Sequence, residues 1–143
     1  MTQTTVLVTG GAGYIGSHAV LALHDAGWRV LVIDDLSNGR REAVPGGVPF
    51  LQANIGDRSA VEPFLREHDV GAVMHFAGSI VVPESVENPH LYYGNNTVAT
   101  HALIGAALAS GVRHILFSST AAVYGAPERV PIAEDEPTKP INP

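Results

Sequence analysis

A glycine-rich turn near the amino terminus constrains the fold more than any other feature of the sequence. The apolar, β-branched run before it predicts a strand, and residues 14–26 after it have the apolar spacing of a helix. Gly11, Gly13 and Gly16 match G-x-G-x-x-G, and Gly10 with the last two matches G-x-x-G-x-x-G. Such glycines permit a tight turn, close approach of a pyrophosphate and close helix–strand packing. The stretch predicts a dinucleotide-binding turn, with a purely structural tight turn as the alternative.

An acidic residue supports dinucleotide binding. Asp34 follows a second apolar run, residues 29–33, and its separation from the turn is close to the roughly 20 residues expected for a ribose-binding carboxylate. Its charge would repel a 2′-phosphate, which favours NAD over NADP. Arg40 and Arg41 weaken this inference, because a nearby arginine can accommodate that phosphate. The polar loop at residues 35–39 fits either cofactor contacts or ordinary turn and capping residues.

The rest of the chain alternates between strand and helix patterns. Short apolar runs predict three more strands, at residues 48–53, 71–75 and 112–117. Two stretches predict helices, at residues 58–68, where Asp57 can cap the first turn, and at residues 90–110. This alternation predicts an α/β fold, a Rossmann-like, doubly wound parallel sheet with strand order 3-2-1-4-5. We expect residues 1–143 to form one dinucleotide-binding domain.

Two segments of the chain lack a clear periodic pattern. Residues 80–85 are apolar for a loop and fit either a pocket lining or packing against another part of the protein, and residues 121–143 are loop-like. Within the last predicted helix, Asn95 and Asn96 interrupt the apolar pattern. Buried amides need hydrogen-bond partners, so we expect at least one of them to bond to a neighbouring loop or a ligand.

The composition narrows the class of protein. The chain has a net charge of −6, and no Lys/Arg cluster exceeds Arg40-Arg41, which argues against electrostatically driven binding to nucleic acid or anionic membranes. The amino terminus lacks a signal-peptide pattern and no apolar run approaches membrane-spanning length, so we expect a cytoplasmic protein. There is no cysteine, and the seven histidines lack metal-ligand spacing, so we expect no metal site.

Longer motifs resemble one enzyme family. They are the turn at residues 9–18, His-Phe-Ala-Gly at 75–78, Pro-Glu-Ser-Val at 83–86, Tyr-Tyr-x-Asn-Asn at 92–96, and the Phe-Ser-Ser-Thr segment with Tyr-Gly at 117–125. Together they resemble the UDP-glucose 4-epimerases, and more broadly the extended short-chain dehydrogenase/reductases that act on nucleotide sugars. The glycine motif is common to that whole superfamily. The segments at 83–86 and 92–96 point more narrowly to the epimerases.

The resemblance implies a reaction and a site. The reaction is an NAD-dependent interconversion at C4 of UDP-glucose and UDP-galactose in galactose metabolism, through a transient 4-keto sugar, in a homodimer. Thr120 would hydrogen-bond the reacting sugar oxygen. With the glycine motif, the implied cofactor contacts are Gly10, Gly13 and Gly16; Tyr14 and Ile15 at the pyrophosphate; Asp34, Asp35, Ser37, Asn38 and Gly39 on the adenosine side; Asn54 and Ile55 beside the adenine; and Phe76, Ala77, Gly78, Asn95 and Ser118 toward the nicotinamide.

Two positions and one missing residue pair depart from the family pattern. Asn54 stands where the family usually has aspartate, and Ile80 where some epimerases have lysine, so NAD affinity is expected to differ. The family's catalytic base belongs to a Tyr-x-x-x-Lys pair, but the only lysine here is Lys139, and Asp135 lies four residues before it. We therefore expect this chain to be the amino-terminal part of a longer protein, to lack the carboxy-terminal substrate-binding part, and to be inactive alone.

Two alternatives stay open. A dehydratase, decarboxylase or reductase of another nucleotide sugar would share the same NAD-binding half, because a fold does not fix a function. A stand-alone dinucleotide-binding module without catalysis would fit the missing base. The fifth strand would then leave an apolar sheet edge exposed, which predicts self-association or poor solubility.

Overall fold

One parallel five-stranded sheet forms the centre of the molecule in the computed structural model, which describes residues 4–143. The strands lie in the order β3-β2-β1-β4-β5, and each neighbouring pair is parallel. This confirms the predicted order. The strands are β1 (Thr5–Thr9), β2 (Arg29–Asp34), β3 (Phe50–Gln52), β4 (Val70–His75) and β5 (His114–Phe117).

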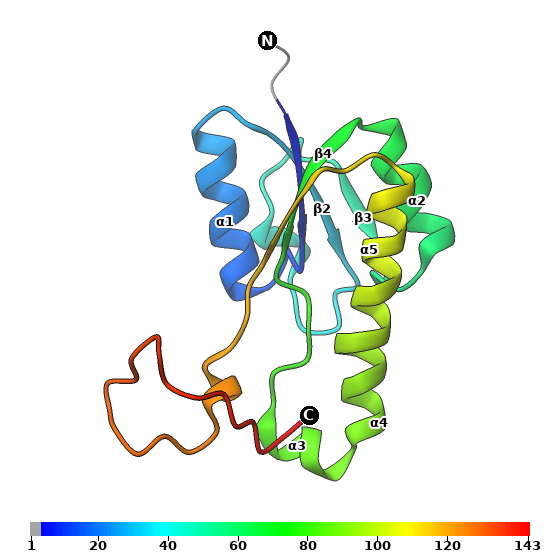
Figure 1. Ribbon diagram of the computed structural model, residues 1–143. Coiled ribbons are helices and arrows are strands. Elements are labelled where there is room, and N and C mark those ends of the chain that lie inside the picture. Colours follow the sequence, from blue (N-terminus) through cyan, green and yellow to red (C-terminus); the bar gives the residue numbers. More distant parts are fainter. Residues whose placement is uncertain (1–3) are drawn as a thin grey trace.

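The alternation of side chains along the central strands explains why helices cover both faces of the sheet. Successive strand residues point to opposite faces. Leu7, Leu31 and Ile33 pack beneath α2 and α5, whereas Val8 and Val32 pack beneath α1, and all five are at most 3% exposed. Figure 1 shows α1 on one side of the sheet and the other two helices on the opposite side. These helices are α1 (Tyr14–Asp25), α2 (Arg58–Glu67) and α5 (Ala99–Ala109).

Helix α2 begins and packs as predicted. The Asp57 side chain accepts hydrogen bonds from the backbone N–H groups of Ser59 (3.1 Å) and Ala60 (3.3 Å), which satisfies two donors that the helix itself leaves free. Val61 and Leu65 lie one turn apart on the same face and are fully buried in the cluster that includes α5. The cap and this apolar face fix α2 against the sheet.

Two strands are shorter than predicted. The third begins at Phe50 and not at residue 48, because Pro49 has no N–H to donate to a strand ladder. The fifth begins at His114, because the N–H of Val112 bonds to the carbonyl of Ala107 at the end of α5 (3.0 Å). Gly111 makes that turn possible with φ +81°, a conformation that favours glycine.

The segment predicted as a loop at residues 80–85 contains a short helix, α3 (Val82–Glu87). A residue outside the helix holds its first turn. The hydroxyl of Tyr92 accepts the N–H of Val81 (3.0 Å) and donates to the carboxylate of Glu84 (2.6 Å). This bridge comes from 8 to 11 residues further along the chain, so no local pattern predicts α3.

The helix predicted at residues 90–110 is not uniform. It consists of α4 (Pro89–Tyr92), a π-helical segment labelled η2 (Tyr93–Val98), and α5. π-Helical turns are rare and are frequent at functional sites. The wide turn carries both asparagines that interrupt the apolar pattern. In Figure 1 the lower end of the combined helix, α4, lies next to α3.

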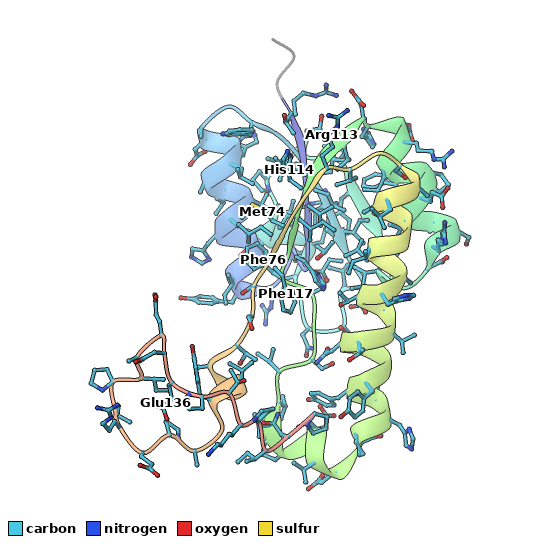
Figure 2. All side chains as sticks on the ribbon, viewed as in Figure 1. Met74, Phe76, Arg113, His114, Phe117 and Glu136 are labelled. Atoms are coloured by element: carbon cyan, nitrogen blue, oxygen red, sulfur yellow. The ribbon has the colours of Figure 1, made fainter. Side chains whose placement is uncertain are left out.

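Strand β5 forms an edge of the sheet, and all four of its residues are exposed. Leu116 and Phe117 have 52% and 61% of their surface exposed. Figure 2 shows Phe117 near Phe76, at the carboxyl ends of β5 and β4, and Glu136 far from both in the carboxyl-terminal loop. As predicted, that loop has little regular structure, with one 3₁₀ turn, Ala121–Tyr124. In residues 4–143 no helix has the length and apolar character needed to cross a membrane.

Candidate cofactor-binding cleft

A cleft lies at the carboxyl ends of the strands, where open α/β sheets bind their ligands. Residues from four different strand–helix connections line it, so the fold brings together side chains that are far apart in the sequence. The predicted cofactor residues that line this cleft are Gly10, Gly13, Asp34, Asp35, Ser37, Asn38, Gly39, Asn54, Ile55, Phe76, Ala77, Gly78 and Asn95.

The turn between β1 and α1 can be built only from small residues. Gly10 has φ +67°, and a Cβ on it would lie 2.7 Å from the backbone nitrogen of Ala77. A Cβ on Gly16 would collide with the carbonyl oxygen of Gly10. Gly13 lies at the N-cap position of α1 and has no side chain to cap the helix. The first N–H groups of a helix lack partners within it, so this end of α1 offers donors to an anion such as a pyrophosphate.

Asp34 ties this turn to the end of β2. Its carboxylate accepts hydrogen bonds from the N–H groups of Ala12 (2.9 Å) and Leu36 (2.8 Å), and the residue is 7% exposed. A carboxylate has about four acceptor positions, so two remain for the hydroxyls of a ribose. The buried charge is thus satisfied by the backbone, and it lies beside the turn as the spacing predicts.

Neither arginine that weakened the NAD inference lines the cleft. The guanidinium of Arg41 lies 4.5 Å from the ring centroid of Phe50 and donates to the carbonyl of Val44 (3.2 Å). Arg40 is held through its backbone N–H, which bonds to the carbonyl of Ala12 (3.0 Å), and its residue surface is exposed. The charged side chains that line the cleft are therefore both carboxylates, those of Asp34 and Asp35.

A hydrogen-bonded group of three side chains closes the end of the cleft at β3. The amide nitrogen of Asn54 donates to Asp35 (3.3 Å) and to Asn95 (3.4 Å), and its oxygen accepts the N–H of Gly56 (2.8 Å). Partial burial acts to raise the pKa of Asp35, but hydrogen bonds from Ser37 and Asn54 outweigh it, so the pKa of this carboxyl is lowered. Asp35 is therefore an anion at neutral pH.

At the β4 end, the asparagines of the π-helical segment hold the loop after the strand. Asn95 donates to the hydroxyl of Ser79 (2.9 Å). Asn96 donates to the carbonyl of Ser79 (2.9 Å) and accepts its N–H (2.8 Å). The prediction that at least one amide bonds to a neighbouring loop is confirmed. Ser79 and Ala53 line the cleft but were not among the predicted contacts, although each directly adjoins a predicted residue.

A buried histidine lies beneath this loop. The Nδ1 of His75 is 2.7 Å from the hydroxyl of Thr9, and its Nε2 is 2.8 Å from the hydroxyl of Thr100. His75 is 2% exposed, and burial lowers its pKa, so the ring is neutral at neutral pH. The three side chains join the carboxyl ends of β1 and β4 to α5. None of the three lines the cleft.

Five predicted site residues lie outside the cleft lining. Tyr14 and Ile15 are 83% and 59% exposed at the start of α1, while Gly16 is buried behind the turn. The Ser118 N–H extends the sheet by bonding to the carbonyl of His75 (3.1 Å). Thr120 accepts the N–H of Ala122 (3.2 Å) and caps the 3₁₀ turn. Over residues 4–143, no group of three or more His, Asp or Glu side chains is arranged to hold a metal ion.

Known proteins share this sequence and this arrangement. Residues 6–143 match the NAD dependent epimerase/dehydratase family. A UDP-glucose 4-epimerase from Azospirillum brasilense is 62% identical over 138 residues, which cover 96% of this chain and 40% of that protein. The structure of UDP-glucose 4-epimerase from Brucella ovis in complex with NAD has a TM-score of 0.92 at 41% identity, covering 97% of this chain and 42% of that chain. A UDP-glucose-4-epimerase from Stenotrophomonas maltophila, with bound NAD and formylated UDP-arabinopyranose, has a TM-score of 0.91 at 39% identity, covering 98% and 44%.

The similarity includes every element that builds the cleft. The chain spans about 40% of the length of the curated relative it matches. Within that span the glycine turn, the strand order and the acidic end of β2 are those expected of a dinucleotide-binding half. The chain belongs to the NAD dependent epimerase/dehydratase family.

Proposed function

We propose that this chain is the NAD-binding part of a UDP-glucose/UDP-galactose 4-epimerase. The observation that carries the proposal is the Asp34 carboxylate, which is bonded to the glycine turn and lies in the same cleft. The names and bound molecules of the relatives support it, since they are UDP-glucose 4-epimerases and two were solved with NAD. The family and these structures support NAD as the cofactor.

The cleft suggests how the cofactor lies. The pyrophosphate would meet the turn at Gly10 and Gly13 and the start of α1, with Tyr14 and Ile15 flanking it. The adenosine ribose would bond to Asp34, with the adenine beyond it toward β3. The nicotinamide would extend the other way, along Phe76, Ala77 and Gly78 with Asn95 and Ser118 near it. Small residues there let a flat ring approach the backbone.

The proposed reaction inverts C4 of the sugar. Bound NAD⁺ would supply a reversible hydride acceptor next to C4, so that the hydride removed from one face of the sugar could return to the other. Thr120 would orient the reacting oxygen: its own oxygen accepts the Ala122 N–H, so its O–H is left to donate. The base of the family belongs to a Tyr-x-x-x-Lys pair, which this sequence does not contain. We therefore propose that the 143-residue chain alone does not turn over UDP-galactose.

The wider setting is also part of the proposal. The whole protein is proposed to act in galactose metabolism, in the cytoplasm and as a homodimer, without nucleic-acid or membrane partners. The net charge of −6 supports the last point, because anionic polymers and surfaces repel it. Gel filtration coupled to light scattering of the full-length protein tests the dimer.

Titration calorimetry of NAD⁺ and NADP⁺ into the cofactor-free chain tests the proposed site. We expect saturable NAD⁺ binding, weaker NADP⁺ binding, and at least a tenfold loss in Asp34→Ala. Asp25→Asn, on the exposed end of α1, controls for the change in net charge. Circular dichroism verifies that each variant is folded. A folded, cofactor-free chain that binds neither dinucleotide would contradict the proposal.

A related enzyme is the second candidate, because the matched family includes dehydratases as well as epimerases. The cleft described here binds only the cofactor in either case. Product analysis of the full-length protein with several nucleotide sugars separates the two: a C4 epimer supports the first proposal, and a dehydrated, decarboxylated or reduced sugar supports the second.

A further inference from the structure

We infer that Asp35, held in place by Asn54, recognises the 6-amino group of the cofactor's adenine and so determines which purine the site accepts. This rests on the proposed binding of NAD. It assigns to Asp35 a role that the adjacent ribose carboxylate, Asp34, does not perform.

The order of the strands places the base near these two side chains. The pyrophosphate position is at the end of β1, and the ribose carboxylate is at the end of β2. The next strand outward is β3, so the base extends toward Ala53, Asn54 and Ile55, which line the cleft. Asp35 lines the same end of the cleft.

The backbone fixes which way the Asn54 amide points. Its oxygen accepts the N–H of Gly56 (2.8 Å), and only the oxygen of an amide can accept a donor. The amide nitrogen must therefore face Asp35 (3.3 Å) and Asn95 (3.4 Å). Both amide hydrogens are directed at these oxygens, so the Asn54 side chain holds the side chains of Asp35 and Asn95 in position.

Asp35 is then the charged acceptor at this end of the cleft. One of its oxygens accepts the N–H of Ser37 (2.9 Å) and the other accepts Asn54, which leaves about two acceptor positions. The two remaining acceptor positions of Asp34 are the ones proposed for the ribose hydroxyls, so Asp35 is the carboxylate left to accept from the base. An exocyclic amine can donate to Asp35 in a charge-assisted hydrogen bond. A 6-oxo group would place an oxygen against the carboxylate and be repelled.

The test compares NAD⁺ with nicotinamide hypoxanthine dinucleotide, which carries an oxygen in place of the amino group. Calorimetry of both against the cofactor-free chain should give about tenfold tighter binding of NAD⁺. In Asp35→Asn the ratio of the two dissociation constants should fall to within about twofold, because an amide can turn either its oxygen or its nitrogen to the base. Asp35→Ala should remove the preference as well. Asp25→Asn should keep the ratio of the unchanged chain.

The outcomes separate this inference from the proposed function. If the unchanged chain binds NAD⁺ with no preference, or if folded Asp35→Asn and Asp35→Ala retain the tenfold ratio, Asp35 does not recognise the base, and NAD binding stands. If the unchanged chain binds neither dinucleotide, the proposed function fails and the inference fails with it.

Discussion

The interior strands β1 and β2 differ from the edge strand β5 in how completely their side chains are buried. At β1 and β2, ten of eleven residues are buried, and the one carboxylate among them has two backbone donors. At β5, all four residues are exposed, three of them large and apolar. The contrast lies within one sheet: β1 and β2 each have a paired strand on both sides and helices packed on them, whereas β5 is an edge strand.

This difference indicates which strands are stabilised by contacts with the rest of the described chain and which are not. Strands β1 and β2 pack against α1, α2 and α5 and against the loop after β4. The stability of the fold should therefore respond strongly to single substitutions in these two strands. Strand β5 has few partners among the described residues, so substitutions there should affect association more than folding.

The largest effect is expected in the glycine turn. Gly16→Ala places a Cβ on the carbonyl of Gly10, which cannot move without displacing β1, so we expect a loss of about 3 kcal/mol in the free energy of unfolding. Gly46→Ala is the matched control, because nothing lies within 4 Å of its added Cβ. Urea denaturation measures both. Equal stability of the two variants would remove the claim that the turn is sterically closed.

The buried hydroxyl of Thr9 comes next. Thr9→Val keeps the shape of the side chain but leaves Nδ1 of His75 without its partner, at an expected cost of about 1–3 kcal/mol. Thr97→Val, on the exposed side of the π-helical segment, should change the free energy of unfolding by less than about 0.5 kcal/mol. Similar losses in both would mean that the His75 bridge contributes little.

The pH dependence of stability reports on the same bridge. Burial lowers the pKa of His75 in the native state below the ordinary value of 6.5, so the unfolded chain binds more protons. The contribution of the neutral His75 ring to the free energy of unfolding is fully present above pH 6.5. It declines as the pH falls below 6.5, by at most about 1.4 kcal/mol per pH unit for this one group. Urea denaturation from pH 8 to pH 5 should show this slope in the unchanged chain. A slope that persists unchanged in His75→Gln would assign it to other groups.

The smallest effect on folding is expected at β5. Leu116→Lys replaces a side chain that is 52% exposed, so the free energy of unfolding should change by less than about 0.5 kcal/mol. Self-association should nevertheless weaken, because a lysine on an edge strand opposes pairing with a second edge. Sedimentation velocity at several concentrations measures it. A chain that is monomeric before the substitution would refute the predicted association.

Local patterns were sufficient to predict the sheet and one side of the cleft. The glycine spacing and the apolar runs each act over a few residues, and the separation of Asp34 from the turn belongs to a known dinucleotide-binding pattern. The structure confirms the predicted strand order and places Asp34 beside the turn. The cap of α2 was predictable for the same reason, since Asp57 bonds to residues two and three positions away. Features that depend on neighbours in the sequence can be recognised in the sequence.

Features that depend on distant partners could not be predicted. Helix α3 is held by Tyr92, and the loop after β4 is held by Asn95 and Asn96, each across 8 to 17 residues. The side-chain amide of Asn54 hydrogen-bonds to residues 19 and 41 positions away from it. The need of Asn95 and Asn96 for partners was evident from their chemistry, but the identity of the partner required the fold.

The π-helical segment also sets the rotational phase between two helices. A wide turn of this kind takes up one more residue than an α-helical turn, which rotates everything after it by about 100°. Tyr92 before the segment is therefore directed at α3, while Thr100 after it meets His75 on the sheet. Deleting one residue between positions 93 and 98 would restore a regular helix and turn Thr100 away from the strand ends. The π-helical segment thus allows the side chains before it to contact α3 and those after it to contact the ends of the strands.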